Sequence, residues 1–400
     1  MTTRSERAVV FLVGAVQFIN ILDFMMVMPL GPYFVEALGI PASSMGIVAG
    51  AYTGSAAIAG LVGSTFLDRF DRRPALGIAM LGLVLGTAAG GFATGLSMML
   101  AARVVAGMFG GPATSLAMSI IADVVPPERR GKALGAVMGA FSVSSIAGVP
   151  AGLWLARHGG WRTPFFAVSG LGLVVCAAAI FLLPSLKLHL ASRDEHPPYA
   201  DMLRRPTVLL SYAMTAVTMT SVFIVVPNIS PFLVFNVGYP YDRLELLYMA
   251  GGLVSIVVLR IAGGLVDRIG SVPVATFGTA GFVAVMVLGF VFSLPAIPIV
   301  LMFVGFMMST SFRNVAYNQI ATRVPSSAER ARFMSLQSAV QHLASAMAGV
   351  AASRILTTEP SGKLLGMPSL AWISITLGVL CPAIMLLIDR RLRSAPDPAR

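Results

Sequence analysis

Four charged side chains lie inside long apolar stretches of the sequence: Asp23, Arg103, Arg260 and Arg313. An ionisable group in hydrocarbon is energetically costly, so a residue of this kind usually has a function. Asp23 lies well inside its apolar stretch, and its depth along a helix differs from that of Arg103 by only about 6 Å. We therefore expect these two side chains to lie within reach of each other.

A buried carboxylate beside an arginine can bind and release a proton, so Asp23 and Arg103 are candidates for coupling proton movement to another process. A structural ion pair that holds two helices together is the alternative. Gln17 and Asn20 share the helical face of Asp23 at about 100° per residue, which predicts a polar stripe facing a water-filled cavity. Gln17 and Asn20 are accordingly candidate cavity residues.

The second half of the sequence carries a comparable set of polar residues. Arg313, Asn314 and Tyr317 are expected on one helix, and Gln337 and Gln341 on the next. All five are candidate substrate contacts. His342 lies in the same stretch as the two glutamines, and because histidine titrates near neutral pH, proton coupling, substrate contact and simple hydrogen bonding are all open for it. Arg260 lies near a helix end, and we expect it to extend to the membrane surface.

The composition indicates where these residues are held. The chain has 400 residues, of which 56% are hydrophobic and only 11% charged, whereas soluble domains have about 25% charged residues. Apolar runs of about twenty residues separated by short charged loops are typical of membrane-spanning helices. We expect twelve spans: 9–33, 44–67, 75–95, 97–122, 133–156, 164–183, 207–236, 243–266, 273–292, 295–320, 333–356 and 368–388. Pro29, Pro150, Pro227 and Pro231 are expected to break or bend the first, fifth and seventh of them.

The longest connection, residues 184–206, divides the spans six to six. The sequence thus predicts an all-α membrane protein with a first bundle over 1–183, a cytoplasmic linker over 184–206 and a second bundle over 207–400. Most of the 28 Lys and Arg residues fall on the side of the two termini. Because basic loops stay on the cytoplasmic side, both termini are expected in the cytoplasm.

The two halves repeat each other at an offset of about 200 residues. LDRFDRRP (Leu67–Pro74) is repeated as VDRIGSVP (Val266–Pro273), and Glu128-Arg129 corresponds to Glu329-Arg330. Charges in these loops could bridge neighbouring helix ends as a latch that holds one conformation; plain positive-inside topology is the alternative reading. The candidate latch residues are Asp68, Arg69, Arg72, Arg73, Asp267 and Arg268.

Taken together, these motifs resemble the major facilitator superfamily, most of all its bacterial drug and sugar (arabinose-type) efflux branch. The resemblance also rests on Arg103 with Gly107, PPERRGKALG (Pro126–Gly135) and GVPAG (Gly148–Gly152) followed by Gly160-Trp161-Arg162. The sequence departs from the family's loop motif at Ser64 and Asp71, and Gly148-Val149-Pro150 stands where an antiporter motif has a Gly-Pro pair.

The resemblance implies two pseudo-symmetric six-helix bundles and a monomeric secondary transporter in a bacterial inner membrane. The expected activity is proton-coupled efflux, by antiport, of a small amphipathic drug-like or sugar-like metabolite. The proton gradient is the expected energy source, and no cofactor is expected. A uniporter or an importing proton symporter is the alternative, and a receptor built on a transporter fold is a further one.

Other classes of function are disfavoured by motifs that the sequence lacks. It has no Walker-type G-x-x-x-x-G-K-[ST] motif, which argues against an ATP-driven pump, and no H-E-x-x-H among its 4 histidines, which argues against a metal site or an intramembrane hydrolase. The basic residues are spread over many loops without interleaved aromatics, so no nucleic-acid partner is expected.

Overall fold

The computed structural model describes residues 3–184, 199–292, 298–326 and 329–394. Eleven helices in these parts are long and apolar enough to cross a membrane. α15 is a twelfth helix of comparable length, and it is not among the eleven because it carries the polar residues Gln337, Gln341 and His342. The long helices are α1 Thr3–Val27, α3 Met45–Phe66, α4 Arg72–Gly91, α5 Leu96–Val124, α6 Pro127–Val143 with α7 Val149–Gly159, α8 Thr163–Leu182, α10 Pro206–Phe223, α12 Leu244–Ile269, α13 Ser271–Val285, α14 Ile299–Arg323, α15 Arg330–Ile355 and α16 Met367–Ser394.

Short elements interrupt or connect these helices. A π-helical segment lies between α6 and α7, and others follow α11 and α13. A hairpin of two short antiparallel strands joins α15 to α16, with Thr357 opposite Leu365. These elements are α2 Gly31–Leu38, α9 Tyr199–Leu203, α11 Ile229–Pro231, η1 Ala42–Ser44, η2 Leu67–Arg69, η3 Ser144–Gly148, η5 Val226–Asn228, η6 Phe232–Asn236, η7 Tyr241–Arg243, η8 Met286–Val291, β1 Thr357–Thr358 and β2 Leu364–Leu365.

Breaks and bends of the helices occur at the prolines for which the sequence predicted them. The first span was predicted to run to residue 33, but α1 ends at Val27 and a turn at Met28–Leu30 precedes α2. Pro29 lies in this turn, and Pro32 is in the first turn of α2, where its missing N–H costs nothing. Pro150 is the second residue of α7, just after the π-helical segment of the fifth span, and Pro227 and Pro231 fall where α10 gives way to η5, α11 and η6. The bend of the first span is therefore a full break.

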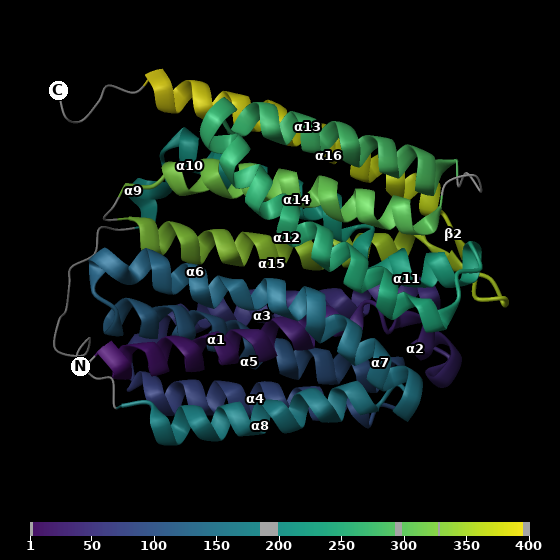
Figure 1. Cartoon of the computed structure of the whole chain (residues 1–400), viewed down its shortest axis with the longest axis horizontal. Coiled ribbons are helices and arrows are strands. Elements are labelled where there is room, and N and C mark those ends of the chain that lie inside the picture. Colours follow the sequence, from purple (N-terminus) through teal and green to yellow (C-terminus); the bar gives the residue numbers. More distant parts are fainter. Residues whose placement is uncertain (1–2, 185–198, 293–297, 327–328, 395–400) are drawn as a thin grey trace.

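The helices form two groups that lie side by side along their length (Figure 1). One group contains α1 to α8 and the other α10 to α16. Within the first, α1 packs on α5, α6 and α8, and α4 on α5 and α8. Within the second, α14 packs on α12 and α13, and α10 on α15 and α16. Between the groups, α3 packs on α15, and α7 and η3 pack on α12. Both termini lie at the same end of the molecule, here called the terminal face; the opposite end is the far face.

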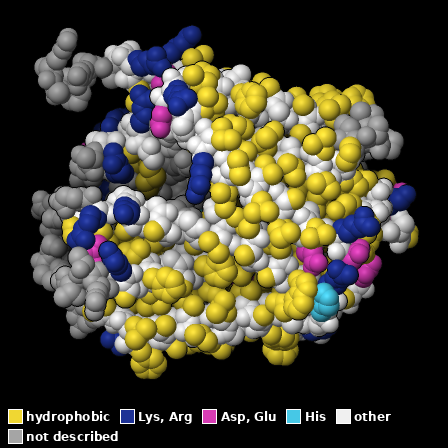
Figure 2. All heavy atoms as spheres, viewed as in Figure 1, with side chains coloured by type: hydrophobic (Ala, Val, Ile, Leu, Met, Phe, Trp, Pro, Cys, Tyr) yellow, Lys and Arg dark blue, Asp and Glu magenta, His cyan; other side chains and the backbone are white. Residues whose placement is uncertain are grey.

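The molecular surface fits a helical bundle immersed in lipid. Figure 2 shows hydrophobic side chains over the middle of the molecule and charged ones gathered at its two ends. Large apolar side chains point outward from the helices, including Phe11, Phe181 and Trp154. Toward the terminal face, the surface is hollowed between the two groups of helices (Figure 2).

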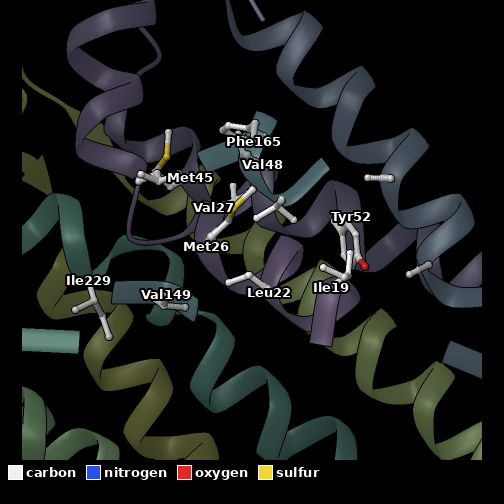
Figure 3. Packing of buried hydrophobic residues seen from close by; sticks show 14 of the residues in the cluster. Ile19, Leu22, Met26, Val27, Met45, Val48, Tyr52, Val149, Phe165 and Ile229 are labelled. Carbon is white, nitrogen blue, oxygen red and sulfur yellow. The ribbon is translucent and has the colours of Figure 1, made fainter. Parts of the chain in front are cut away.

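The larger hydrophobic cluster lies inside the first group and crosses to the second toward the far face. Figure 3 shows its central part, where Leu22 and Met26 of α1 lie among residues of α3, α7 and α8. Ile229 of α11 belongs to the same cluster as Val149 of α7. A second cluster, around Tyr317 and Phe333, is confined to the second group. The apolar core thus joins the two groups at the far face and leaves each with its own core near the termini.

Candidate functional site

Asp23 and Arg103 form a buried ion pair between α1 and α5. Arg103 NH2 lies 3.0 Å from Asp23 Oδ1 and 2.9 Å from Oδ2, and NH1 donates to the backbone oxygen of Asp23 at 3.2 Å. Asp23 is 0% and Arg103 1% exposed. The expectation that the two side chains lie within reach of each other is confirmed.

Two further helices complete the surroundings of the pair. Thr87 of α4 donates its hydroxyl to Asp23 Oδ1 at 2.7 Å. Tyr52 of α3 places its ring 5.3 Å from the Arg103 guanidinium carbon. The Asp23 carboxylate therefore accepts from Arg103 and Thr87, whereas Arg103 Nε has no hydrogen-bond partner in the described part of the chain. The sequence analysis missed both residues because a single threonine or tyrosine in an apolar helix is an ordinary feature.

Tyr52 also connects the ion pair to the polar stripe of α1. Its hydroxyl donates to Asn20 Oδ1, and Asn20 Nδ2 donates to the Gly110 carbonyl at 2.7 Å and to Thr114 Oγ1 at 2.8 Å. Gln17 is buried one turn away, and its Oε1 accepts no hydrogen bond from the described residues. Polar side chains thus follow one another at one-turn intervals along α1, at Gln17, Asn20 and Asp23.

The second group of helices holds a hydrogen-bond cluster around Tyr317. Gln337 and Gln341 of α15 donate to the Tyr317 hydroxyl at 2.8 Å and 3.1 Å. That hydroxyl in turn donates to Thr215 of α10 at 3.3 Å. Gln337 Oε1 is buried and accepts no hydrogen bond from the described residues. The structure therefore brings together three of the predicted contact residues, on the two helices that the sequence assigned to them.

Arg313 is buried elsewhere in the second group, without a carboxylate. It is 1% exposed, its NH2 donates to Ser221 Oγ at 2.9 Å, and its guanidinium carbon lies 4.3 Å from the ring centre of Phe282. Its Nε and NH1 have no hydrogen-bond partner among the described residues. Arg313 thus remains a buried cation, and the second group offers no counterpart of Asp23 in the spans that the structure describes.

Two predicted residues lie apart from this cluster. Asn314 is exposed and receives hydrogen bonds from Asn318, one turn along α14. His342 is partly buried on α15, and no hydrogen bond joins it to Arg313 in the described part of the structure. Arg260 is exposed on α12, and its extension to the membrane surface stays a prediction.

Among the described residues, the loop motif at the terminal face forms a short ion pair. Arg72 Nε lies 2.5 Å from Asp123 Oδ2, which joins the start of α4 to the end of α5 within the first group. Asp71 caps α4 by accepting from the Arg73 amide at 3.1 Å. Arg69 is exposed on η2, and the side chain of Asp68 lies outside the described residues.

The repeat of this motif forms a weaker contact. Asp267, near the end of α12, accepts a hydrogen bond from Gln319 of α14 at 3.3 Å. Arg268 is exposed. Both contacts therefore join helices of the same group, and whether they act as a latch stays a prediction.

Two further ion pairs at the terminal face are related by the internal repeat, but the acidic and basic partners are exchanged between the helices. Arg129 of α6 pairs with Glu6 of α1 at 2.9 Å, and Glu329, just before α15, pairs with Arg205, just before α10, at 2.5 Å. The hydrogen bond from the Ser326 hydroxyl, and after it the Arg205 guanidinium, hold the pKa of the Glu329 carboxyl below its ordinary value. The first and fifth spans of each group are thus tied together where they begin.

Hydrogen bonds between the two groups lie at the far face. Ser353 Oγ of α15 accepts from the Ile47 amide of α3 at 3.0 Å, and Thr358 of the hairpin accepts from the Ser43 amide at 2.9 Å. Arg157 of α7 pairs with Glu245 of α12 at 3.4 Å, and the Tyr241 hydroxyl donates to Glu36 at 2.6 Å. The groups are joined at the far face and hollowed between them toward the terminal face (Figure 2).

The sequence profile of the Major Facilitator Superfamily matches this chain in two segments, residues 13–349 and 212–400. The chain belongs to the Major Facilitator Superfamily. The family and the curated relatives of this chain are membrane transporters and not enzymes, which agrees with the sequence analysis. Among the described residues, no group of three or more His, Cys, Asp and Glu side chains could hold a metal ion.

Curated relatives within the superfamily are distant. The chain is 28% identical over 281 residues to the purine ribonucleoside efflux pump NepI of Escherichia coli O157:H7, covering 69% of each chain. It is 25% identical over 236 residues to the chloramphenicol resistance protein of Streptomyces lividans, covering 57% of this chain and 60% of the relative. It is also 24% identical over 258 residues to the transporter YtbD of Bacillus subtilis, covering 64% of this chain and 63% of the relative. The match thus spans less than two thirds of the length of these last two relatives.

Solved structures of the superfamily share the fold over nearly the whole chain. The crystal structure of a D-xylose-proton symporter aligns with a TM-score of 0.76 over 96% of this chain and 97% of that one, at 18% identity. A bacterial homolog of the human lysosomal transporter Spinster, in an inward-facing and unoccupied conformation, aligns with a TM-score of 0.76 at 15% identity, over 99% of this chain. These likenesses confirm the predicted major facilitator fold.

Proposed function

We propose that this transporter exports a small amphipathic organic compound in exchange for protons, and that Asp23 is the residue that binds the proton. The buried Asp23–Arg103 pair carries the proposal. It combines an acid fully removed from solvent, a single cationic partner and a chain of polar groups through Tyr52 and Asn20. Residues of this kind in a membrane interior form proton pathways.

Charge balance explains how a proton at Asp23 would change the conformation. The ionised pair is neutral as a whole, so it tolerates burial. A proton on Asp23 removes the negative charge and leaves Arg103 as an uncompensated buried cation. The protein can relieve that cost only by letting water or another group reach Arg103. Protonation would therefore favour a rearrangement of α1 against α5, which gives proton uptake a mechanical consequence.

The polar residues of both groups suit a substrate with several hydrogen-bonding groups and an apolar part. Gln17 and Gln337 each keep a buried amide oxygen without a donor among the described residues. Phe24 and Phe223, from α1 and α10, have ring centres 6.0 Å apart across the boundary between the groups. Amide oxygens offer acceptors to hydroxyl and N–H groups, and the rings offer a flat apolar surface. Nucleosides and uncharged amphipathic drugs have this combination.

The direction of transport rests on the orientation of the molecule. We propose that the terminal face is cytoplasmic, because most Lys and Arg residues of the loops lie there. The far face, where hydrogen bonds join the groups, then faces outward, and the structure represents a state open to the cytoplasm. In this state an exporter accepts its substrate.

The test uses everted membrane vesicles that are energised by respiration and carry a dye that reports the pH difference. Purine nucleosides, cationic drugs, uncharged amphipathic drugs, lipophilic anions and sugars are added in turn. We expect proton release on addition of at least one class in the wild type and none in Asp23→Asn, whereas Asp23→Asn still exchanges labelled for unlabelled substrate without a gradient.

A matched control is Asp242→Asn, which makes the same chemical change at an exposed position in the short helix η7 at the far face. It should release protons like the wild type. Proton release that survives Asp23→Asn would contradict the assignment of the proton site. Loss of exchange together with loss of coupling would make Asp23 a binding or structural residue, and gradient-driven uptake in right-side-out vesicles would make the protein an importer.

A further inference from the structure

A pocket of about 350 Å³ opens on the terminal face of the second group of helices. It lies where the turn between α12 and α13 meets the ends of α14 and α16. The Asp23–Arg103 pair is in the other group of helices, so this pocket is separate from the proposed transport site. Its lining combines three arginines, one acid, a helix start and four apolar side chains.

The pocket has an excess of positive charge. Arg323, Arg390 and Arg393 line it together with a single acid, Asp389. Asp389 pairs with Arg393 at 2.8 Å and with Arg323 at 3.5 Å. Arg390 is exposed and forms no ion pair with the described residues. One carboxylate is thus shared by two arginines while a third is left over, so the lining attracts an anion.

The start of α13 supplies hydrogen-bond donors to the same pocket. Gly270, with φ +89°, turns the chain so that α13 begins at Ser271. The amides of Ser271 and Val272 have no acceptor within the helix, because the first amides of any helix lack one. The positive end of the helix dipole lies at this point and favours an anion.

Ser271 is the independent indication that something binds here. Its side chain lines the pocket and is only 7% exposed, yet its hydroxyl forms no hydrogen bond with any described residue. The hydroxyl oxygen keeps some accessible surface at the pocket, so it is free to bind a ligand there. A ligand in the pocket that accepts hydrogen bonds would satisfy this hydroxyl together with the two free amides.

The rim of the pocket is apolar on one side. Ile269 and Leu386 line it and are 53% and 38% exposed. Since Leu386 lies within the apolar part of α16, this side faces the region where lipid chains lie. An anionic lipid would fit this arrangement, with its polar anionic end in the pocket and its hydrophobic part along Leu386.

We propose that this pocket binds a phosphate group, through Arg390, the Ser271 hydroxyl and the first amides of α13. Phosphate carries the negative charge and the several acceptor oxygens that this set of donors requires. It could come from the headgroup of an anionic phospholipid or from inorganic phosphate, and these two sources can be separated by experiment.

The test measures binding of short-chain phosphatidylglycerol to the purified full-length protein in an uncharged detergent, by native mass spectrometry. Arg390→Gln removes the unpaired charge, and Ser271→Asp places a carboxylate in the pocket while suiting a helix start. We expect each to weaken binding about fivefold or more, which corresponds to the roughly 1 kcal/mol that a basic residue contributes near an anionic membrane surface. Arg391→Gln, one residue away and outside the pocket lining, should leave binding unchanged.

Competition with inorganic phosphate then identifies the source. Displacement of phosphatidylglycerol by millimolar phosphate would show that the pocket accepts the free anion, and retention of the lipid would show that it requires the headgroup with its chains. Either result supports a phosphate site. Unchanged binding in both Arg390→Gln and Ser271→Asp would overturn the proposal, and so would an equal loss in Arg391→Gln, because binding would then follow surface charge alone.

Discussion

At the scale of single residues, the molecule handles its two deeply buried arginines differently. Arg103 has Asp23 as its counter-ion, whereas Arg313 is held by a serine hydroxyl and the face of Phe282. A buried ion pair is tolerated mainly because its two charges cancel, so removal of one partner costs more than removal of both. A comparison of single and double variants can therefore separate the structural from the functional contribution of the Asp23–Arg103 pair.

The residue-scale prediction is a double-mutant cycle. Asp23→Asn and Arg103→Gln should each lower the free energy of unfolding by about 3–5 kcal/mol, because each leaves the other charge uncompensated. The double variant should recover most of that loss and should still fail to couple protons. Thermal unfolding in detergent reports the first effect and the vesicle assay the second. A double variant as unstable as the sum of the two single ones would show that the pair does not interact as the structure indicates.

At the scale of elements, the seam between α3 and α15 joins the two groups at the far face. Gly46 and Gly349 meet there, and a methyl group added at Gly46 would collide with the Gly349 carbonyl and lie 2.9 Å from Ser353 Oγ. The backbones approach so closely only because both positions are glycines, which is typical of helix contacts in membranes. The seam is therefore sensitive to a single carbon atom.

We predict that Gly46→Ala opens the far face. Overpacking of this kind costs about 1–3 kcal/mol, which would shift the equilibrium between closed and open far faces by roughly 5- to 150-fold. Spin labels on Ala37 and Lys363, both exposed on opposite groups, should report a longer distance by pulsed electron resonance. Gly60→Ala lies on the same helix, where an added methyl group meets nothing within 4 Å, and it should leave the distance unchanged. An unaltered distance in Gly46→Ala would show that the seam does not set the closed state.

The elements also show how far a sequence of this kind can be interpreted. The spans could be predicted because charges and prolines interrupt the apolar runs, and the depth of Asp23 and Arg103 could be counted along them. The break after Val27 could be placed only to within a few residues, because a proline indicates a bend without fixing the turn that follows. Thr87 and Tyr52 could not be predicted as partners of the ion pair, since their contacts depend on how α3 and α4 rotate against α1. The pocket at Ser271 could likewise not be predicted, because its lining comes from three separate segments of the sequence.

At the scale of the whole molecule, the positions of the contacts imply two states. Among the described residues, the hydrogen bonds between the groups lie at the far face, whereas each group has an apolar core of its own near the termini. A molecule built in this way can rock as two bodies about its middle, closing one end while opening the other. Such rocking requires the contact between Ser43 and Thr358 to separate in every cycle.

The final prediction concerns a disulfide that would hold this contact closed. Ser43 Oγ and Thr358 Oγ1 lie 3.0 Å apart, so Ser43→Cys with Thr358→Cys should form a disulfide when the far face meets an oxidant. The cross-linked protein should keep its fold and lose transport, because the far face can no longer open, and a reducing agent should restore transport. The single cysteine variants serve as controls under the same oxidant, and the two native cysteines, Cys176 and Cys381, are buried and free. Full transport activity in protein shown by mass to be cross-linked would mean that substrate crosses without separation of the far face, and the two-body mechanism would have to be abandoned.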